Sequence, residues 1–219
     1  MRRDLLMRRR THRDDGAGQA RPVLVWRFDP PVRCISTGVL GGGLGLRSWA
    51  INAEVTHDYR RRDPAAHAAA IGTEPGLRPG ADVVILTAAP VLDVASYADG
   101  GVSCDATVGV SVPTWAASAE ADETAWVPGT INLVCHLPVP LDDPALVNAV
   151  VTATEAKTQA LLELGVSGTG TATDSVLVCC LPGGGESYAG PRSTWGARLA
   201  RAVRAAVADG TTRYLAGRR

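Results

Sequence analysis

The sequence predicts an α+β fold, a single domain in which a mixed, largely antiparallel sheet packs against about three helices. Proline and glycine residues divide the chain into alternating strand-like and helix-like segments, without a repeat of solenoid period. Seven of these segments are short runs rich in β-branched and apolar residues, which indicates a sizeable sheet. The length of 219 residues fits one hydrophobic core. A layered α/β arrangement is the alternative fold.

The predicted strands mostly follow one another through short connections, which favours antiparallel pairing. They cover 23–28, 32–36, 49–55, 82–87, 102–112, 130–137 and 174–181. The last two flank a helical segment, and the order strand, helix, strand is typical of a parallel crossover. We therefore expect at least one parallel pair in the sheet.

Three helices have recognisable ends. The dipeptide Asp-Pro opens two of them, at 63–64 and 143–144, because Asp caps a helix and Pro fits its first position. These helices end before Gly72 and Gly165. The third begins near Ser193, carries apolar residues at helical spacing on one face, and ends at 209–210.

Composition and charge exclude several classes of function. The formal net charge is zero and the pI is about 6.9, so no long-range field attracts nucleic acid or an anionic membrane. No segment has the roughly 18 consecutive apolar residues that a membrane helix needs. The five cysteines lie in apolar runs without metal-ligand spacing, which indicates reduced, buried thiols in a cytoplasmic protein. We expect no metal and no other cofactor.

The first 22 residues differ from the rest of the chain. They are rich in arginine and contain only a three-residue apolar run, so we expect residues 1–22 to form a disordered basic arm. Residues 23–219 then form the single domain.

A glycine-rich segment, GVLGGGLG at 38–45, follows the second predicted strand. It matches neither the dinucleotide fingerprint nor a Walker loop. Gly41, Gly42 and Gly43 still allow backbone N–H groups to approach a ligand closely, and such groups bind oxyanions. A tight turn between two strands explains the same glycines equally well.

The chain has only three asparagines, and each is a candidate for substrate binding. Asn52 and Asn132 fall in predicted strands, where Asn is disfavoured, and Asn148 falls in the second helix. An Asn side chain offers both a donor and an acceptor, which suits recognition of amide groups. A hydrogen-bond network inside the fold is the alternative for each of them.

The second helix carries Lys157, the single lysine among 22 basic residues. At about 100° per residue, Asn148, Glu155 and other polar residues form one stripe of the helix. Lys157 lies on the opposite, apolar face, so we expect Lys157 to point inward and Glu155 outward. A lysine on an apolar face extends its ammonium to the surface, finds a carboxylate, or loses its proton. The last two outcomes favour a functional lysine.

The segment GTGTATD at 168–174 leads into the last predicted strand. Hydroxyls and glycines that end in a carboxylate suit a polar ligand or a nucleophile, and Thr173 and Asp174 are the candidates. A loop stabilised by side-chain turns is the alternative.

Several motifs together resemble the adenosylcobinamide amidohydrolase family. They are VLGGGLGLRSWAIN, TVGVSVPTWAA, PGTINLV, ALVNAVVTATEAKTQALLELGV, GTATDSV and YAGPRSTWGARLARAV, and they span residues 36–207. The resemblance implies hydrolysis of the amide bond between aminopropanol and the corrin ring of adenosylcobinamide, which yields adenosylcobyric acid for corrinoid salvage and cobalamin biosynthesis. It implies a corrinoid small-molecule substrate, and it leaves a homo-oligomer open.

The residue roles are hypotheses built on amide chemistry. Hydrolysis needs an activated nucleophile, stabilisation of the oxyanion, and an acid for the departing amine. We assign Asp174 or Glu155 as the base for water and Lys157 as the stabiliser or acid. The glycines at 41–43 and the asparagines serve as donors to amide oxygens, and Thr130 or Thr173 is the nucleophile of a covalent variant.

Two other functions fit the same sequence. One is a corrinoid-binding protein without catalysis, although no histidine occurs here in a cobalt-binding DxHxxG motif. The other is an amidase that acts on another small amide.

Overall fold

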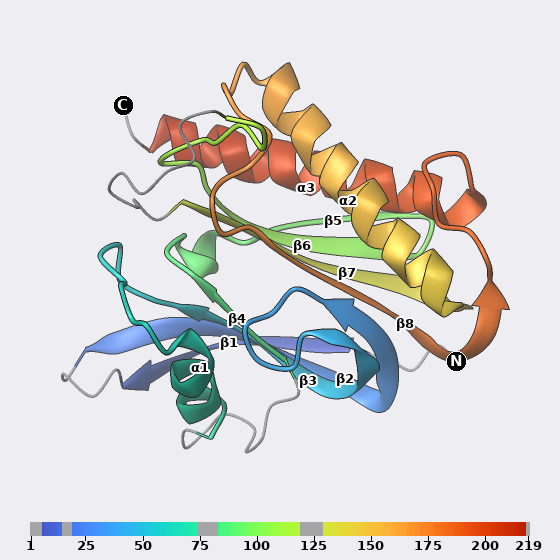
Figure 1. The fold of residues 1–219 in the computed structure, drawn as a ribbon, viewed down its shortest axis with the longest axis horizontal. Helices are drawn as coiled ribbons and strands as arrows, with labels where there is room; N and C mark the ends of the chain where they lie inside the picture. The colour runs from blue at the N-terminus through green and yellow to red at the C-terminus, as the bar shows by residue number, and fades with distance from the viewer. Residues whose placement is uncertain (1–5, 15–18, 74–82, 119–128, 218–219) are drawn as a thin grey trace.

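The computed structural model describes residues 6–14, 19–73, 83–118 and 129–217 (Figure 1). In these segments eight strands form one sheet, accompanied by three α-helices and a short 3-10 helix. The elements in chain order are β1 (Leu6–Asp14), β2 (Ala20–Ser36), β3 (Gly43–Glu54), α1 (Pro64–Gly72), β4 (Val83–Thr87), η1 (Val91–Asp93), β5 (Ala95–Asp99), β6 (Val102–Gly109), β7 (Thr130–Leu141), α2 (Asp143–Glu163), β8 (Ser175–Glu186) and α3 (Thr194–Ala216).

The sheet is mixed, as the sequence predicts. Its strand order is β4-β3-β2-β8-β7-β6-β5, and β1 pairs with β2 off this path. The β7–β8 pair is parallel and is connected through α2, which confirms the predicted crossover. The β3–β4 pair is also parallel and is connected through α1, and the other pairs are antiparallel. The α+β prediction is confirmed.

The sheet folds over on itself to give two β-layers (Figure 1). The N-terminal half (β1–β4) and the C-terminal half (β5–β8) are joined in the sheet by the β2–β8 pair alone among the described strands. That pair is short, with Arg33–Ser36 facing Leu177–Cys180. A buried apolar cluster fills the space between the layers and draws side chains from both halves of the sheet. Trp26 on β2 extends across this space, and its Nε1 donates to Asp105 Oδ2 on β6 at 2.8 Å.

Helices cover the two outer faces of this double layer. Helix α1 packs on β2, β3 and β4 through Ala68 and Ile71. Helices α2 and α3 lie side by side on the face of β6, β7 and β8 that points away from the N-terminal half (Figure 1). Because β2 is covered on both faces, nearly all of its residues from Val23 to Phe28 are apolar. None of the helices in the described segments has the length and hydrophobicity that a bilayer crossing requires.

The strands differ from the prediction in two ways. The predicted strands 23–28 and 32–36 form one long strand, β2, because the prolines between them shift the register with β3 without ending the strand. Strand β5 was missing from the prediction. It forms a hairpin with β6 through Gly100 and Gly101, which both have positive φ, and this Gly-Gly pair is a recognised hairpin signal.

Several predicted boundaries are wrong. Strand β3 begins at Gly43, before the predicted 49, and β7 and β8 extend past the predicted 137 and 181 to Leu141 and Glu186. Within the arm 1–22 that was expected to be disordered, Leu6–Asp14 is strand β1, because its backbone supplies hydrogen-bond partners to the first half of β2. The third helix continues past 209–210 to Ala216. Gly210 lies inside this helix and does not end it. A Cβ at this position would lie 2.7 Å from Val108 Cγ2, so the glycine allows α3 to pack closely on β6.

The five cysteines are free and buried, as predicted. Burial raises the pKa of the Cys179 and Cys180 thiols, which lie on β8. These thiols therefore act as core side chains.

Candidate active site

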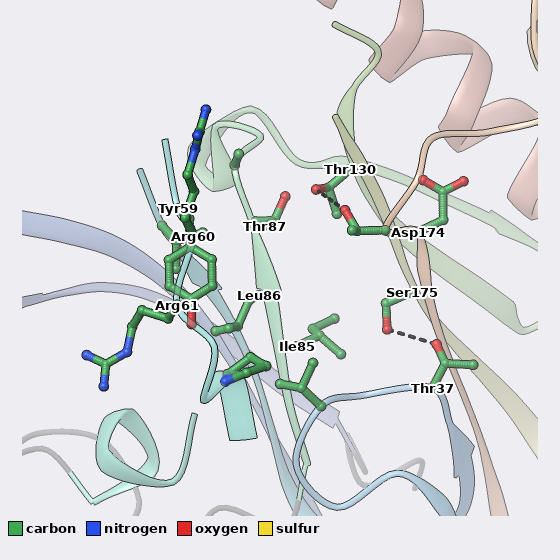
Figure 2. Close-up of a pocket in the computed structure, with 15 residues that line it drawn as sticks. Thr37, Tyr59, Arg60, Arg61, Ile85, Leu86, Thr87, Thr130, Asp174 and Ser175 are labelled. Atoms are coloured by element: carbon green, nitrogen blue, oxygen red, sulfur yellow. Dashed lines mark hydrogen bonds between the residues drawn. The ribbon is translucent and has the colours of Figure 1, made fainter. Parts of the chain in front are cut away.

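A cavity of about 570 Å³ lies where the two β-layers meet. It is formed by the ends of β2, β3 and β4 on one side and by the starts of β7 and β8 on the other. Its polar wall residues are Thr37, Tyr59, Arg60, Arg61, Thr87, Thr130, Thr173, Asp174 and Ser175, and its apolar ones are Val39, Val55, Pro64, Ile85, Leu86 and Ala88. Figure 2 shows the hydroxyls of Thr87 and Thr130 on the edge between the layers.

The predicted inward orientation of Lys157 is confirmed. Its side chain is 8% exposed, although it lies on a helix whose other face meets solvent. The ammonium forms an ion pair with the carboxylate of Asp174, which is 12% exposed at the entrance of β8. The crossover β7, α2, β8 brings the two residues together, since α2 packs over the strand that Asp174 precedes.

The Asp174 carboxylate is held by at least three donors. Oδ1 accepts the backbone N–H of Ile131 at 2.9 Å, and Oδ2 accepts the backbone N–H of Thr171 at 3.1 Å and the Lys157 ammonium. Thr171 Oγ1 lies 2.5 Å from Oδ1 and 2.6 Å from the carbonyl oxygen of Gly129, so its single proton serves one of these two acceptors. In Figure 2 the carboxylate also points away from Thr37, Tyr59 and Thr87, so it supports the wall of the cavity from behind.

The loop 168–171 encloses this ion pair. A methyl group at Gly170 would overlap both the Asp174 carboxylate and the Lys157 ammonium, so only glycine allows the loop to pass this close. Helix α2 holds the same loop through Thr158, whose Oγ1 donates to Thr169 O at 3.0 Å. The loop therefore presents Thr173 and Asp174 in fixed positions.

Two pairs of hydroxyls line the cavity. Thr130 Oγ1 and Thr173 Oγ1 are 3.1 Å apart, and Thr173 Oγ1 is 3.1 Å from the carbonyl oxygen of Gly129. Thr37 Oγ1 and Ser175 Oγ are 3.0 Å apart (Figure 2). The structure thus brings the predicted candidates Thr130 and Thr173 together.

Asn52 and Asn132 form the internal network that was the alternative to substrate binding. Asn132 Nδ2 donates to Asn52 Oδ1 and to Leu86 O, both at 3.0 Å, and Asn52 Nδ2 donates to Thr107 Oγ1 at 3.0 Å. Both asparagines are 1% exposed. Their amide N–H groups tie β7 to β3 and β4, which fixes the two sides of the cavity relative to each other.

Three other predicted positions lie away from the cavity. Asn148 is near the start of α2, where its Oδ1 accepts the N–H of Ala189 at 3.2 Å. Glu155 is exposed on the outer face of α2, as predicted, and does not approach the cavity. Helical periodicity also placed Thr152 on the polar stripe, but it is buried and donates to Ala189 O at 2.8 Å.

The glycines at 41–43 form the turn between β2 and β3. Gly41 and Gly43 have positive φ, and the Gly41 carbonyl accepts from Arg47 Nη2 at 2.9 Å. Of the segment 38–45, only Val39 lines the cavity. The geometry corresponds to the tight turn that was the alternative explanation.

Some wall residues were not among the predicted site residues. Thr37, Thr87 and Ser175 are single hydroxyl residues at strand ends, and strand prediction could have indicated only that they share one edge of the sheet. Tyr59, which lines the cavity, hydrogen-bonds His67 Nδ1 through its hydroxyl at 3.0 Å.

The charged groups of the wall lie beside α1. Arg61 binds Asp63 through two hydrogen bonds of 2.9 and 2.8 Å, and this contact holds the pKa of the Asp63 carboxyl below its usual value. Asp63 is the N-cap residue of α1, but its carboxylate binds Arg61 and makes no side-chain hydrogen bond to the helix. The cavity therefore combines hydroxyls, one carboxylate, two arginines and apolar surface.

Comparison with known proteins identifies the family. The family model described as adenosylcobinamide amidohydrolase matches residues 4–219. A protein of Halobacterium salinarum named adenosylcobinamide amidohydrolase is 33% identical over 192 residues, which is 81% of this chain and 79% of that protein. A protein of Methanosarcina mazei with the same name is 30% identical over 179 residues, 77% of this chain and 84% of that protein. The chain belongs to the adenosylcobinamide amidohydrolase family.

Proposed function

We propose that the protein hydrolyses the amide bond between aminopropanol and the corrin ring of adenosylcobinamide, giving adenosylcobyric acid for cobalamin salvage. Family membership supports the substrate class. The observation that carries the proposal is the hydroxyl-lined cavity, whose wall is built on the buried Lys157–Asp174 pair. The reaction takes place in this cavity.

The substrate enters with its aminopropanol side chain. A volume of about 570 Å³ accommodates that side chain with its amide, while the much larger corrin macrocycle remains at the mouth. Val39 is 43% exposed at the cavity wall and offers apolar surface to the ring edge. The ring's peripheral amides then meet solvent and the surrounding loops.

Water is the nucleophile in this proposal. Its oxygen adds to the carbonyl carbon, the C–N bond breaks, and the protons of the water pass to the departing nitrogen, so the products are a carboxylate and protonated aminopropanol. Lys157 and Asp174 position the loop that presents Thr173, because the carboxylate binds the ammonium and two backbone N–H groups and points away from Thr87 in Figure 2. Glu155 has no role, since it lies on the outer face of α2.

Incubation of the purified protein with adenosylcobinamide tests the proposal. Chromatography with mass spectrometry should detect free aminopropanol and a corrinoid carboxylic acid in equal amounts. Binding of the corrinoid without release of aminopropanol would instead support a binding protein. A covalent adduct on Thr130 or Thr173 in quenched reactions would contradict water as the nucleophile.

A further inference from the structure

Two cysteines face each other at the junction between the two halves of the sheet. Cys34 on β2 and Cys179 on β8 are direct partners in the antiparallel β2–β8 pair, and their Sγ atoms are 2.9 Å apart. Both side chains belong to the buried apolar cluster between the β-layers. The two sulfur atoms therefore already lie close to the separation of about 2.0 Å that a disulfide requires.

The register of the two strands also suits a disulfide. Antiparallel strands alternate between residue pairs that exchange backbone hydrogen bonds and pairs that do not. The backbone N–H of Thr37 donates to Val176 O at 3.0 Å, and counting back along the register from this bonded pair makes Cys34–Cys179 a non-bonded one. The Cα atoms of such a pair are about 4.5 Å apart, within the range of about 4.4–6.8 Å found in disulfides.

The other three cysteines do not connect the two halves of the sheet. Cys180 points to the opposite face of β8, into the apolar cluster under α2 and α3. Cys104 and Cys135 are direct partners in the β6–β7 pair and belong to that same cluster. A disulfide between these two would join neighbouring strands of the C-terminal half only.

We propose that Cys34 and Cys179 form a redox modification site, which a small disulfide such as oxidised glutathione converts into a disulfide that locks the two β-layers together. One cysteine thiolate attacks a sulfur of oxidised glutathione, which gives a mixed disulfide and releases one glutathione. The second cysteine thiolate attacks the protein sulfur of the mixed disulfide, the Sγ–Sγ bond forms, and the second glutathione leaves. The two cysteines lose two electrons and two protons, and the two glutathione thiols take them up.

Burial determines when this exchange takes place. Both cysteines are 0% exposed, and burial raises the pKa of the Cys179 thiol, so the folded protein offers little thiolate to an oxidant. Oxidised glutathione therefore reaches the two thiols while the chain unfolds and refolds. In the folded, oxidised protein the disulfide is buried in the same place, so a reductant also reaches it only after unfolding.

The disulfide acts where the two halves of the sheet are held together. Among the described strands, the four residue pairs of β2 and β8 are the only link in the sheet between these halves. The bond joins positions 145 residues apart, and a cross-link over a long loop removes much of the conformational entropy of the unfolded chain. It also fixes the ends of β2 and β8 beside which Thr37 and Ser175 line the cavity.

Refolding of the wild type from urea in a glutathione redox buffer tests the proposal. Remaining thiols are alkylated in denaturant, and the protein is digested with trypsin. Cleavage after Arg33 and Arg47 leaves Cys34 as the one cysteine of its peptide, and cleavage after Lys157 and Arg192 leaves the two β8 cysteines together in another. Mass spectrometry should find these two peptides joined in most molecules.

Two variants identify which β8 cysteine takes part. Cys179→Ala should abolish the link between the two peptides. Cys180→Ala is the matched control, because it removes the neighbouring buried thiol, which points to the opposite face of β8, and it should retain the link.

Urea unfolding measures the lock between the layers. The midpoint of the oxidised wild type should lie on the order of 1 M above that of the reduced protein. Oxidised Cys180→Ala should show the same rise, and Cys179→Ala refolded in the same buffer should show none. Dithiothreitol should reverse the rise only when urea is present.

The wild type alone decides the outcome, so a variant that fails to fold does not affect the test. Free Cys34 after refolding in the redox buffer, or Cys34 joined to a cysteine other than Cys179, would overturn the modification site. A Cys34–Cys179 disulfide that leaves the urea midpoint unchanged would overturn the lock.

Discussion

Replacement of Lys157 by methionine tests whether the buried ion pair stabilises the cavity wall. Methionine retains the apolar stem of the side chain and removes the charge, which leaves the Asp174 carboxylate 12% exposed without its cation. Removing one partner of a buried ion pair costs about 3–5 kcal/mol. Asp174 retains the N–H groups of Ile131 and Thr171 as donors, so we expect about 3 kcal/mol, the lower end of this range.

The assay is equilibrium unfolding in urea. With a slope of about 2–3 kcal/mol per molar urea, a loss of about 3 kcal/mol moves the midpoint down by about 1–1.5 M. The double variant Lys157→Met/Asp174→Asn removes both charges and should be more stable than the sum of the single effects predicts, with a coupling of about 2 kcal/mol. Arg204→Met is the control, because its ion pair with Glu163 is exposed and should contribute less than about 1 kcal/mol. A Lys157→Met variant as stable as Arg204→Met would refute the reasoning.

Three further predictions concern the loop, the start of α2 and the core. Gly170→Ala should cost about 1–3 kcal/mol and reduce turnover, because its methyl group overlaps the ion pair. Gly184→Ala, whose methyl group would lie at an ordinary contact distance of 3.8 Å from Asp142 Oδ1, should be neutral in both measurements. Asn148→Ala should lower stability in urea by about 1 kcal/mol and leave KM unchanged; a large rise in KM would show that Asn148 binds substrate. Cys179 and Cys180 should react with a thiol reagent only after unfolding, because both are buried and burial raises their pKa values.

The parts of the fold that depend on local pattern could be predicted from the sequence. The Asp-Pro dipeptides mark the starts of α1 and α2, and the strand, helix, strand order predicts the parallel β7–β8 pair. The folding of the sheet into two layers depends on four residue pairs between β2 and β8, which are about 140 positions apart in the chain. No local pattern encodes that contact, so the junction that forms the cavity was not predictable.

In the candidate site, too, local features could be predicted from the sequence and long-range contacts could not. Periodicity of one helix was sufficient to place Lys157 inward, because orientation on a helix is a local property. Its partner Asp174 belongs to a different element, and the pairing depends on how α2 packs over β8. Thr37 and Thr87 were not predicted as site residues, since only the folded chain brings them to the wall of one cavity.

The most direct test of the account is a crystal structure of the protein with adenosylcobinamide bound. We predict that the aminopropanol amide lies in the cavity between the β-layers, beside the hydroxyls that line it. Corrinoid density at another surface, such as the outer face of α2 beside Glu155, with an empty cavity between the layers, would contradict the account.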